Sequence, residues 1–326
     1  MWLISSPRHL ASCFKSAVAA VCDRRIAGPT NPTSSMPRRF LLVGLLWFAP
    51  LAAFAEEASE REVVVRDNDP GDAFEEPGGY GQPEWVDRSR ASVTTKLYVL
   101  NPWETFVGLR SEFDVSRYGK TACDLTQEFE IGLPGRVEFD LENEVTGRGG
   151  RLAESEGSVG LRYAFATWDK LPLNPAIAAT YHFRTGEKLA ASSGGDVGEL
   201  RLLLGQEFLP RLLWTANAFY QRAFAGGHDR QIGFTQDVSY LVVTDKLELG
   251  TEMRYANVSQ RREHRGGANE FVIGPSVNWK PNARTVVSLA PLVGCTPDSP
   301  RVAILASVSV EFGGGESKNS FRAQTR

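Results

Sequence analysis

The chain has 326 residues, of which 42% are hydrophobic and 23% charged, with 31 glycines, 18 prolines and a formal net charge of −3. This composition is too apolar and aromatic for a wholly disordered chain, and it has neither collagen-like nor coiled-coil periodicity. The mildly acidic balance offers no basic surface for nucleic acid, so no nucleic-acid partner is expected.

A cleaved secretory signal peptide is predicted at residues 36–55. Met36-Pro37-Arg38-Arg39 gives a basic start, and an uncharged run then continues to Ala55. A membrane anchor is the alternative, but the run is shorter than the roughly 20 residues that a helix needs to cross a bilayer, and Pro50 interrupts it. Residues 1–35 lie upstream of this signal and are interpreted as an over-long gene start.

Downstream of the signal, apolar and charged residues alternate with a period close to two. Val137, Phe139 and Leu141, for example, alternate with Glu138 and Asp140. Successive side chains of a strand point to opposite faces, so each such segment has an apolar face and a charged face. A soluble β-sandwich can have the same pattern.

The length and spacing of these segments favour a membrane barrel over a sandwich. Most have about 10 to 13 residues, whereas a tilted membrane strand needs about 9 to 11 and globular strands most often have about 5 or 6. Tight connections such as residues 133–135 and 209–211 alternate with mostly longer ones such as 147–153 and 259–268, which is typical of periplasmic turns and external loops. The predicted fold is all-β, a transmembrane antiparallel up-and-down β-barrel of twelve strands. The strands are expected at residues 105–115, 122–132, 136–145, 154–166, 175–184, 198–208, 213–223, 231–242, 246–257, 269–279, 284–293 and 302–312.

The barrel is therefore expected to occupy residues 105–312. Residues 56–104 precede it as an acidic, flexible periplasmic lead-in, and residues 313–326 follow it as a polar tail. Within the lead-in, residues 93–100 are predicted to form either an extra strand or a plug segment inside the lumen.

The last predicted strand alternates up to an aromatic residue. Val302, Ile304, Val308 and Val310 lead to Phe312. This pattern is similar to the terminal strand signal read by the outer-membrane barrel assembly machinery, which is therefore an expected partner. The polar tail is a departure from that pattern, in which the aromatic usually ends the chain.

One hairpin carries a family resemblance. The run Gln127-Glu128-Phe129-Glu130-Ile131-Gly132-Leu133-Pro134-Gly135-Arg136-Val137-Glu138-Phe139 resembles a hairpin of the MetA-pathway phenol-degradation transporter family. Val159-Gly160-Leu161-Arg162-Tyr163 and Lys246-Leu247-Glu248-Leu249-Gly250 are also similar to that family. The resemblance implies an outer-membrane barrel that transports small compounds, aromatic ones among them.

Charged residues are expected to line the lumen if the apolar face meets lipid. The lining would then be acid-rich, above all on the second and third strands. Two interpretations remain open: these residues pair across strands and fill the barrel, or the carboxylates give a lining that favours cations. The candidate lining or binding residues are Arg110, Glu128, Glu130, Glu138, Asp140, Glu142, Glu144, Arg162, Arg201, Glu248, Glu252 and Arg254.

The histidines and cysteines of the sequence do not indicate a catalytic or metal site. His182 is expected to line the lumen, and His228 and His264 lie in predicted loops without a recognisable nucleophile motif, so we expect neither an enzyme nor a cofactor. No Cys/His cluster suggests a metal site. The loop residues Arg261, Arg262, His264 and Arg265 are candidates for contact with lipopolysaccharide.

A disulfide between Cys123 and Cys295 is predicted as a candidate. These are the two cysteines left after signal cleavage, and export places them in an oxidising compartment. Barrel closure brings the external ends of the first and last strands together, although loop folding must supply the final approach.

The sequence thus predicts an exported protein of a Gram-negative-type outer membrane, surrounded by outer-membrane lipids. It would act as a pore or passive transporter of small molecules through a charged, acid-rich lumen. A non-conducting structural or receptor barrel is the alternative, and an outer-membrane enzyme is a more remote one.

Overall fold

The computed structural model describes a single compact unit within residues 75–326. The predicted signal at residues 36–55, the upstream residues 1–35 and the basic loop with Arg261 and Arg265 lie outside the described residues. Side chains of residues 148 and 151–155 are likewise outside the description. The described residues are 80–83, 85, 90–119, 121–148, 151–185, 196–224, 230–244, 246–259 and 267–313.

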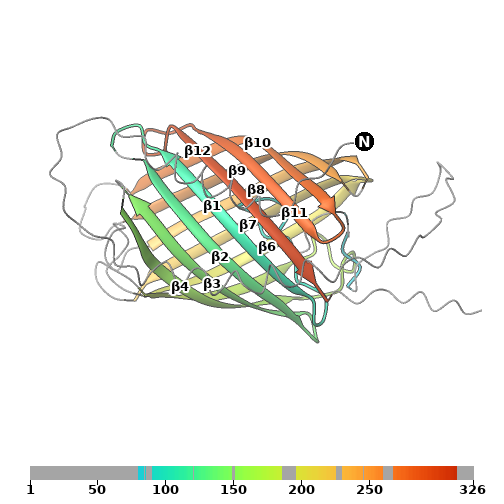
Figure 1. The fold of residues 1–326 in the computed structure, drawn as a ribbon. Coiled ribbons are helices and arrows are strands. Elements are labelled where there is room, and N and C mark those ends of the chain that lie inside the picture. Colours follow the sequence, from blue (N-terminus) through green and yellow to red (C-terminus); the bar gives the residue numbers. More distant parts are fainter. Residues whose placement is uncertain are drawn as a thin grey trace, which may run out of the picture. The chain divides into compact units, whose positions relative to one another are not determined.

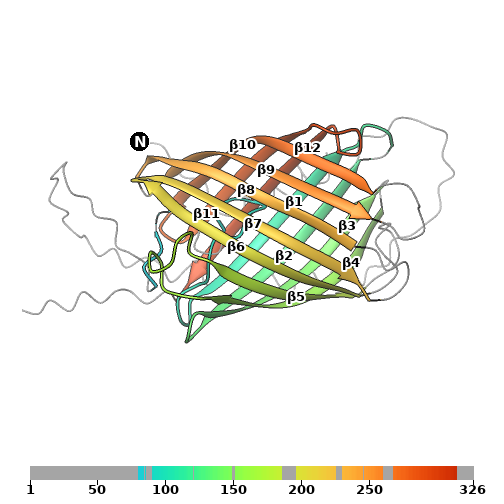
Figure 2. The same cartoon turned by 180° about the vertical axis from the view of Figure 1, so that it is seen from behind.

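Twelve strands of the described chain form a closed antiparallel barrel, which confirms the predicted fold class and strand number. Each strand pairs with its neighbours in sequence, and β1 pairs with β12 along its whole length to close the barrel. The strands are long and tilted (Figures 1 and 2). Their bounds are β1 Thr105–Val115, β2 Ala122–Leu133, β3 Val137–Arg148, β4 Arg151–Ala164, β5 Ala176–Arg184, β6 Val197–Leu209, β7 Leu212–Ala223, β8 Arg230–Val243, β9 Leu247–Ser259, β10 Ala268–Asn282, β11 Thr285–Gly294 and β12 Val302–Phe312.

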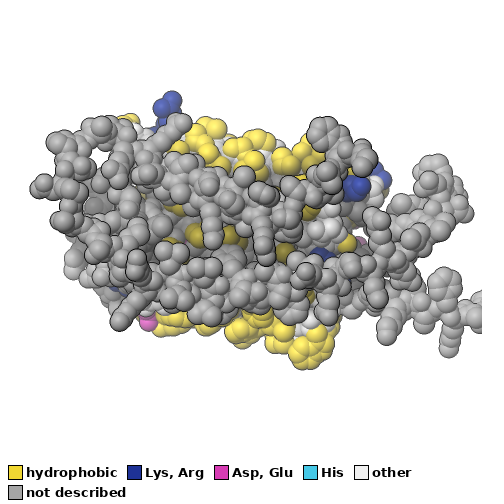
Figure 3. Space-filling view, in the orientation of Figure 1, with side chains coloured by type: hydrophobic (Ala, Val, Ile, Leu, Met, Phe, Trp, Pro, Cys, Tyr) yellow, Lys and Arg dark blue, Asp and Glu magenta, His cyan; other side chains and the backbone are white. Residues whose placement is uncertain are grey.

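The outer surface of the barrel is apolar while its inside is polar. Large hydrophobic side chains such as Leu200, Ile232 and Leu289 are exposed, and hydrophobic side chains cover much of the described surface in Figure 3. Glu130 and Arg162, by contrast, are fully buried. This inverted arrangement is that of a barrel whose outer face meets lipid, so the chain is a transmembrane β-barrel of the outer-membrane type. No helix among the described residues has the length and apolarity that a bilayer crossing needs.

Aromatic side chains lie exposed near the barrel ends. Phe208 and Trp279 are exposed near the end of the tight turns, and Tyr181 and Phe224 stack near the other end. These positions suit the two lipid–water interfaces of a membrane barrel. Trp168 departs from this pattern: it belongs to the β4–β5 connection but is buried inside the lumen.

Part of the lumen wall is apolar. Ala290 and Leu292 of β11 and Ala303 and Leu305 of β12 are fully buried and pack against Val93. On β11, apolar residues therefore occupy both faces, and the pattern with period two disappears from the sequence. The described lumen accordingly has an apolar stretch on β11 and β12, which β1 separates from the charged wall of β2 and β3.

The predicted Cys123–Cys295 disulfide is wrong for this structure, in which both residues are described and no bond joins them. Cys123 is buried in β2, where it pairs with Phe113 of β1. Cys295 is exposed just after β11. Since β12 and β1 lie between β11 and β2, and neighbouring strands are about 4.8 Å apart, the two cysteines are separated by about twice the roughly 7 Å that a disulfide allows.

A reagent outside the cell should reach only one of the two barrel ends. We expect Cys295, which is exposed beside the β11–β12 connection, to react with a membrane-impermeant maleimide on intact cells. In a Cys295→Ser background, Pro134→Cys in the exposed β2–β3 turn should react only after the outer membrane is permeabilised. Mass spectrometry of the labelled peptides checks both sites, and the reverse pattern of labelling would invert the orientation.

Candidate functional site

Residues 90–104, which we call the plug, lie just ahead of β1. Residues 90–101 lie inside the barrel and are buried except for the partly buried Lys96, whereas Trp103 is exposed. Arg90 and Lys96 form an antiparallel bridge, and the backbone N–H of Ala91 donates to the carbonyl of Thr95 at 2.9 Å, so the chain turns back on itself. The plug makes hydrogen bonds to β2, β7 and β9, which are not neighbours in the sheet, and only a segment within the lumen reaches all three. Of the two alternatives for residues 93–100, the structure has the plug and not an extra strand.

The returning limb of the plug packs on an apolar floor. Leu97, Tyr98 and Val99 are fully buried in a cluster with side chains of β4 to β8 and with Trp168. The rings of Tyr98 and Trp168 meet edge to face with centroids 5.3 Å apart, and the Tyr98 hydroxyl donates to the carbonyl of Ala166. Burial of each such side chain contributes about 1.5–3 kcal/mol, so this floor anchors the plug.

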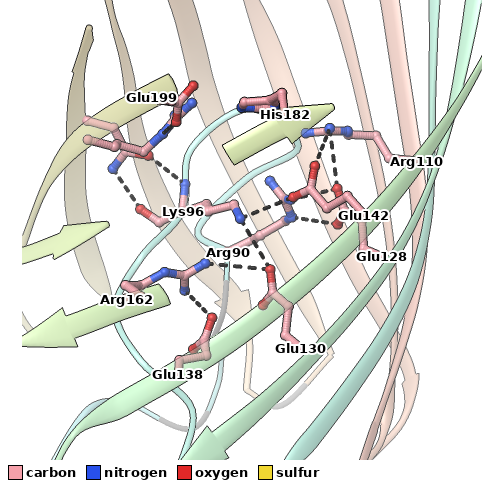
Figure 4. Close-up of polar contacts among 12 residues, drawn as sticks. Arg90, Lys96, Arg110, Glu128, Glu130, Glu138, Glu142, Arg162, His182 and Glu199 are labelled. Carbon is pink, nitrogen blue, oxygen red and sulfur yellow. Dashed lines mark hydrogen bonds and ion pairs between the residues drawn. The ribbon is translucent and has the colours of Figure 1, made fainter. Parts of the chain in front are cut away.

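The tip of the plug is the turn formed by residues 90–96, which Arg90 and Lys96 close. The guanidinium group of Arg90 points into the acidic wall of β2 and β3 (Figure 4). Arg90 donates two hydrogen bonds to the carboxylate of Glu128, from Nη2 at 2.6 Å and from Nε at 3.0 Å. The Arg90 Nη2 atom also lies 3.7 Å from Oε1 of Glu142. This bidentate arrangement is the strong and geometrically specific form of an arginine–carboxylate pair.

Lys96 places a second cation beside the first. Its Nζ atom lies 3.2 Å from Oε1 of Glu142 and 3.4 Å from Oε1 of Glu130. The Lys96 backbone is clamped by Asn217 of β7, whose side chain accepts from the Lys96 N–H and donates to the Lys96 carbonyl, both at 2.8 Å.

The charge of Lys96 is stabilised by its surroundings. Burial alone would lower the pKa of Lys96, but the nearby carboxylates, led by Glu142 and then Asp140 and Glu130, more than offset it. The pKa of Lys96 is therefore raised above its ordinary value. The side chain remains an ammonium group inside the barrel.

Two barrel arginines complete the network of ion pairs. Arg162 of β4 lies 2.9 Å from Glu138 and 3.5 Å from Glu130, and it donates to the Tyr98 carbonyl at 2.6 Å. Arg110 of β1 lies 3.3 Å from Glu128. The carboxylates of β2 and β3 are thus shared between cations of the barrel and cations of the plug.

Polar groups of β9 and β10 hold the far side of the plug. Glu252 accepts a hydrogen bond from the Thr94 N–H at 2.5 Å. The Asn278 side chain donates to the Ala91 carbonyl at 3.0 Å and to Glu248 at 3.2 Å. The plug tip is therefore bound to opposite parts of the barrel wall through side chains and backbone groups.

Asp140 is a carboxylate that the plug leaves without a direct partner. It lies on β3 between Glu138 and Glu142 and is 1% exposed, and its Oδ1 atom has no hydrogen-bond partner among the described residues. Both of its oxygens lie where a side chain on Gly160 would begin, since a Cβ there would be 2.4 Å from each. Glycine at position 160 thus makes room for this carboxylate.

A cavity of about 230 Å³ lies on the plug tip. Arg90 and Lys96 line it together with Glu142, Glu144 and Arg201 of the barrel. Arg201 donates from Nε to Glu199 at 2.8 Å, and its guanidinium lies 4.9 Å from the centre of the Phe219 ring.

A histidine–carboxylate pair also lines this cavity. His182 Nδ1 lies 2.7 Å from Glu156, while its Nε2 atom is buried without a hydrogen-bond partner among the described residues. Ser158 is the cross-strand neighbour of His182, but no hydrogen bond between them is formed. The described residues contain no group of three metal-ligating side chains with a geometry for a metal ion.

Ion pairing also crosses the lumen beyond the plug. Arg254 of β9 forms a bidentate pair with Glu112 of β1, although three strands separate β9 from β1 in the sheet. Such a pair can form only through the interior.

The structure places the twelve predicted lining residues on the inner face of the barrel. The acids Glu128, Glu130 and Glu142 converge on the plug, whereas Arg254 lies away from it. Sequence reasoning missed Arg90 and Lys96, the two cations around which the network is built. The available signal was their placement at the start and the middle of an otherwise uncharged run.

Fold and site together define a β-barrel of the outer-membrane type whose described lumen is occupied by the segment that precedes β1. No protein-family model matches the sequence, and no curated protein matches it either. Solved structures similar in fold include the COG4313 outer-membrane channel from Pseudomonas putida F1, with 10% identity over 66% of this chain and 97% of that chain and a TM-score of 0.49. The NanC porin has 12% identity over 64% of this chain and 99% of that one, with a TM-score of 0.46. The KdgM porin has 12% identity over the same shares, with a TM-score of 0.42.

Removal of Arg90 should loosen the plug. Arg90→Ala leaves the buried Glu128 without its bidentate partner, and loss of one member of a buried pair costs about 3–5 kcal/mol. Hydrogen exchange of the protected N–H groups of Thr94, Lys96 and Leu100 should then accelerate at least about a hundredfold, while the strands keep their protection. Mass spectrometry of residues 90–104 in the folded barrel measures this.

Arg254→Ala is the matched control, because it removes a lumen arginine that does not touch the plug. Unchanged exchange of the plug in Arg90→Ala would mean that the apolar floor alone holds it.

Proposed function

We propose that the protein is a passive channel for small solutes in the outer membrane and that the plug closes it at rest. The observation that carries this proposal is the pairing of Arg90 and Lys96 with the acids of β2 and β3. An interior that served only as scaffold could pair its charges within the barrel wall, as Arg162 and Glu138 do. Here the neutralising cations sit on a separate segment, which can leave without unpairing a strand.

The vacated lumen would favour cations. Glu128, Glu130, Glu138, Asp140, Glu142 and Glu144 face Arg110 and Arg162 on this part of the wall, so carboxylates predominate once the plug cations are gone. Carboxylate-lined pores raise the local concentration of cations. The two interpretations of the sequence then belong to two states, with paired acids when closed and a cation-favouring lining when open.

Export and orientation form part of the same proposal. The signal at residues 36–55 would direct the chain to the periplasm and be cleaved. The tight turns would face the periplasm and the longer loops the exterior, where the basic residues Arg261, Arg262 and Arg265 would meet lipopolysaccharide.

Planar-bilayer recordings test the channel. The protein should open rarely, whereas Arg90→Ala with Lys96→Ala should raise the open probability and Arg254→Ala should not. In the opened variant, reversal potentials in asymmetric KCl should indicate a preference for K⁺.

Neutralising Glu128, Glu130, Glu138 and Asp140 together should reduce that preference, more so at low salt where screening is weaker. An unchanged preference would mean that these carboxylates only support the barrel and do not select ions. Absence of current in every variant would favour the non-conducting receptor barrel, whose lumen the plug fills permanently.

A further inference from the structure

The plug tip has the form of a ligand bound in a site. Its guanidinium group meets a carboxylate in a bidentate pair, and its ammonium group lies between two further carboxylates. We infer that Glu128, Glu130 and Glu142 form a binding site for small organic dications that carry guanidinium or ammonium groups, and that Arg90 and Lys96 occupy it as a tethered competitor. This inference rests on the proposed channel function and names its solute class.

The geometry limits the length of such a solute. Arg90 Nη2 and Lys96 Nζ contact the same atom, Oε1 of Glu142, at 3.7 Å and 3.2 Å. The distance between the two nitrogens therefore cannot exceed the sum of these two distances. A short linear dication such as agmatine, which has a guanidinium group and an ammonium group joined by four methylene groups, meets this limit when its methylene chain is partly folded.

The site has acceptor capacity that the plug does not use. Asp140 is 1% exposed and lies on the lumen face between Glu138 and Glu142, and its Oδ1 atom has no hydrogen-bond partner among the described residues. A buried carboxylate is expensive unless a cation or hydrogen-bond donors meet it. Its place among the other carboxylates points to a cationic ligand with more donors than the two plug side chains supply.

The cavity gives a solute access to the site. It lies on the plug tip, and Arg90, Lys96 and Glu142 all line it. Its volume of about 230 Å³ is far above the roughly 10–15 Å³ that a single water needs, which suits a small solute. Of the three carboxylates of the site, Glu142 is the one that lines this cavity, and it is also the carboxylate that contacts both plug cations.

Competition with a tethered group has a measurable consequence. The plug leaves the site vacant in only a fraction of the molecules. The apparent affinity for a free dication is the intrinsic affinity multiplied by that fraction. Removing the two plug cations abolishes the competition without touching the carboxylates. The dissociation constant for agmatine should therefore fall at least tenfold in Arg90→Ala with Lys96→Ala.

Isothermal titration calorimetry of the full-length barrel in detergent tests this inference with agmatine as the probe. Adipate, a dianion of similar length, and glycerol should not bind. Adding Glu128→Gln and Glu142→Gln to the variant without plug cations should abolish agmatine binding, whereas adding Arg254→Ala should not. If the alanine variants fail to fold, as judged by heat-modifiable gel mobility, Arg90→Gln with Lys96→Gln serves the same purpose with smaller changes in volume.

An unchanged agmatine affinity on removal of the plug cations would overturn the inference. Equal binding of adipate or glycerol would also overturn it. Because calorimetry needs no current, the two proposals fail separately: agmatine binding in a barrel that never conducts refutes only the channel, and conduction without agmatine binding refutes only the solute class.

Discussion

The fold depends on how a barrel accommodates carboxylates that water does not reach. Glu130 and Glu138 are fully buried and Glu128 nearly so, and an ionised carboxylate without a partner costs several kcal/mol in such a setting. Arg110 and Arg162 of the barrel do not suffice for this wall, and Arg90 and Lys96 supply the remaining positive charge. Glu128, Glu130 and Glu142 therefore stabilise the docked plug, and the docked plug stabilises these carboxylates. Neither part reaches its low-energy state alone.

The plug is held by two kinds of interaction that respond differently to conditions. The apolar floor around Tyr98 and Trp168 depends on burial and is not weakened by ionic screening. The contacts of Arg90 and Lys96 are electrostatic, and a free cation can replace them. Since Leu97, Tyr98 and Val99 make most of the floor contacts whereas Arg90 and Lys96 make the charged ones, displacement of the two cations need not release the floor. Such an arrangement allows the lumen to open while the segment stays attached.

The strands could be predicted from the sequence because one face is apolar and the other charged, and the predicted and observed bounds of β1 and β12 coincide. The inner position of Glu138 or Glu252 follows from the same parity. The alternation does not distinguish the inner face where both faces are apolar, as for Ala290 and Leu292. It also gives no information on residues outside strands, such as Trp168. Arg90 and Lys96 were missed for this second reason: a segment without a period gives no indication of which way its side chains point. Only the folded chain brings positions 90 and 128 together.

The barrel also explains why the plug does not become a thirteenth strand. β1 and β12 pair along their whole lengths, so no edge remains to which residues 93–100 could add, and antiparallel closure favours an even number of strands. The segment must satisfy its backbone through side chains of the wall instead, and Asn217, Glu252 and Glu138 provide partners for Lys96, Thr94 and Leu100. Side-chain partners of this kind can exchange with water or solute one at a time, whereas a strand ladder separates cooperatively. A plug bound in this way suits reversible occupation of the lumen better than a permanent seal.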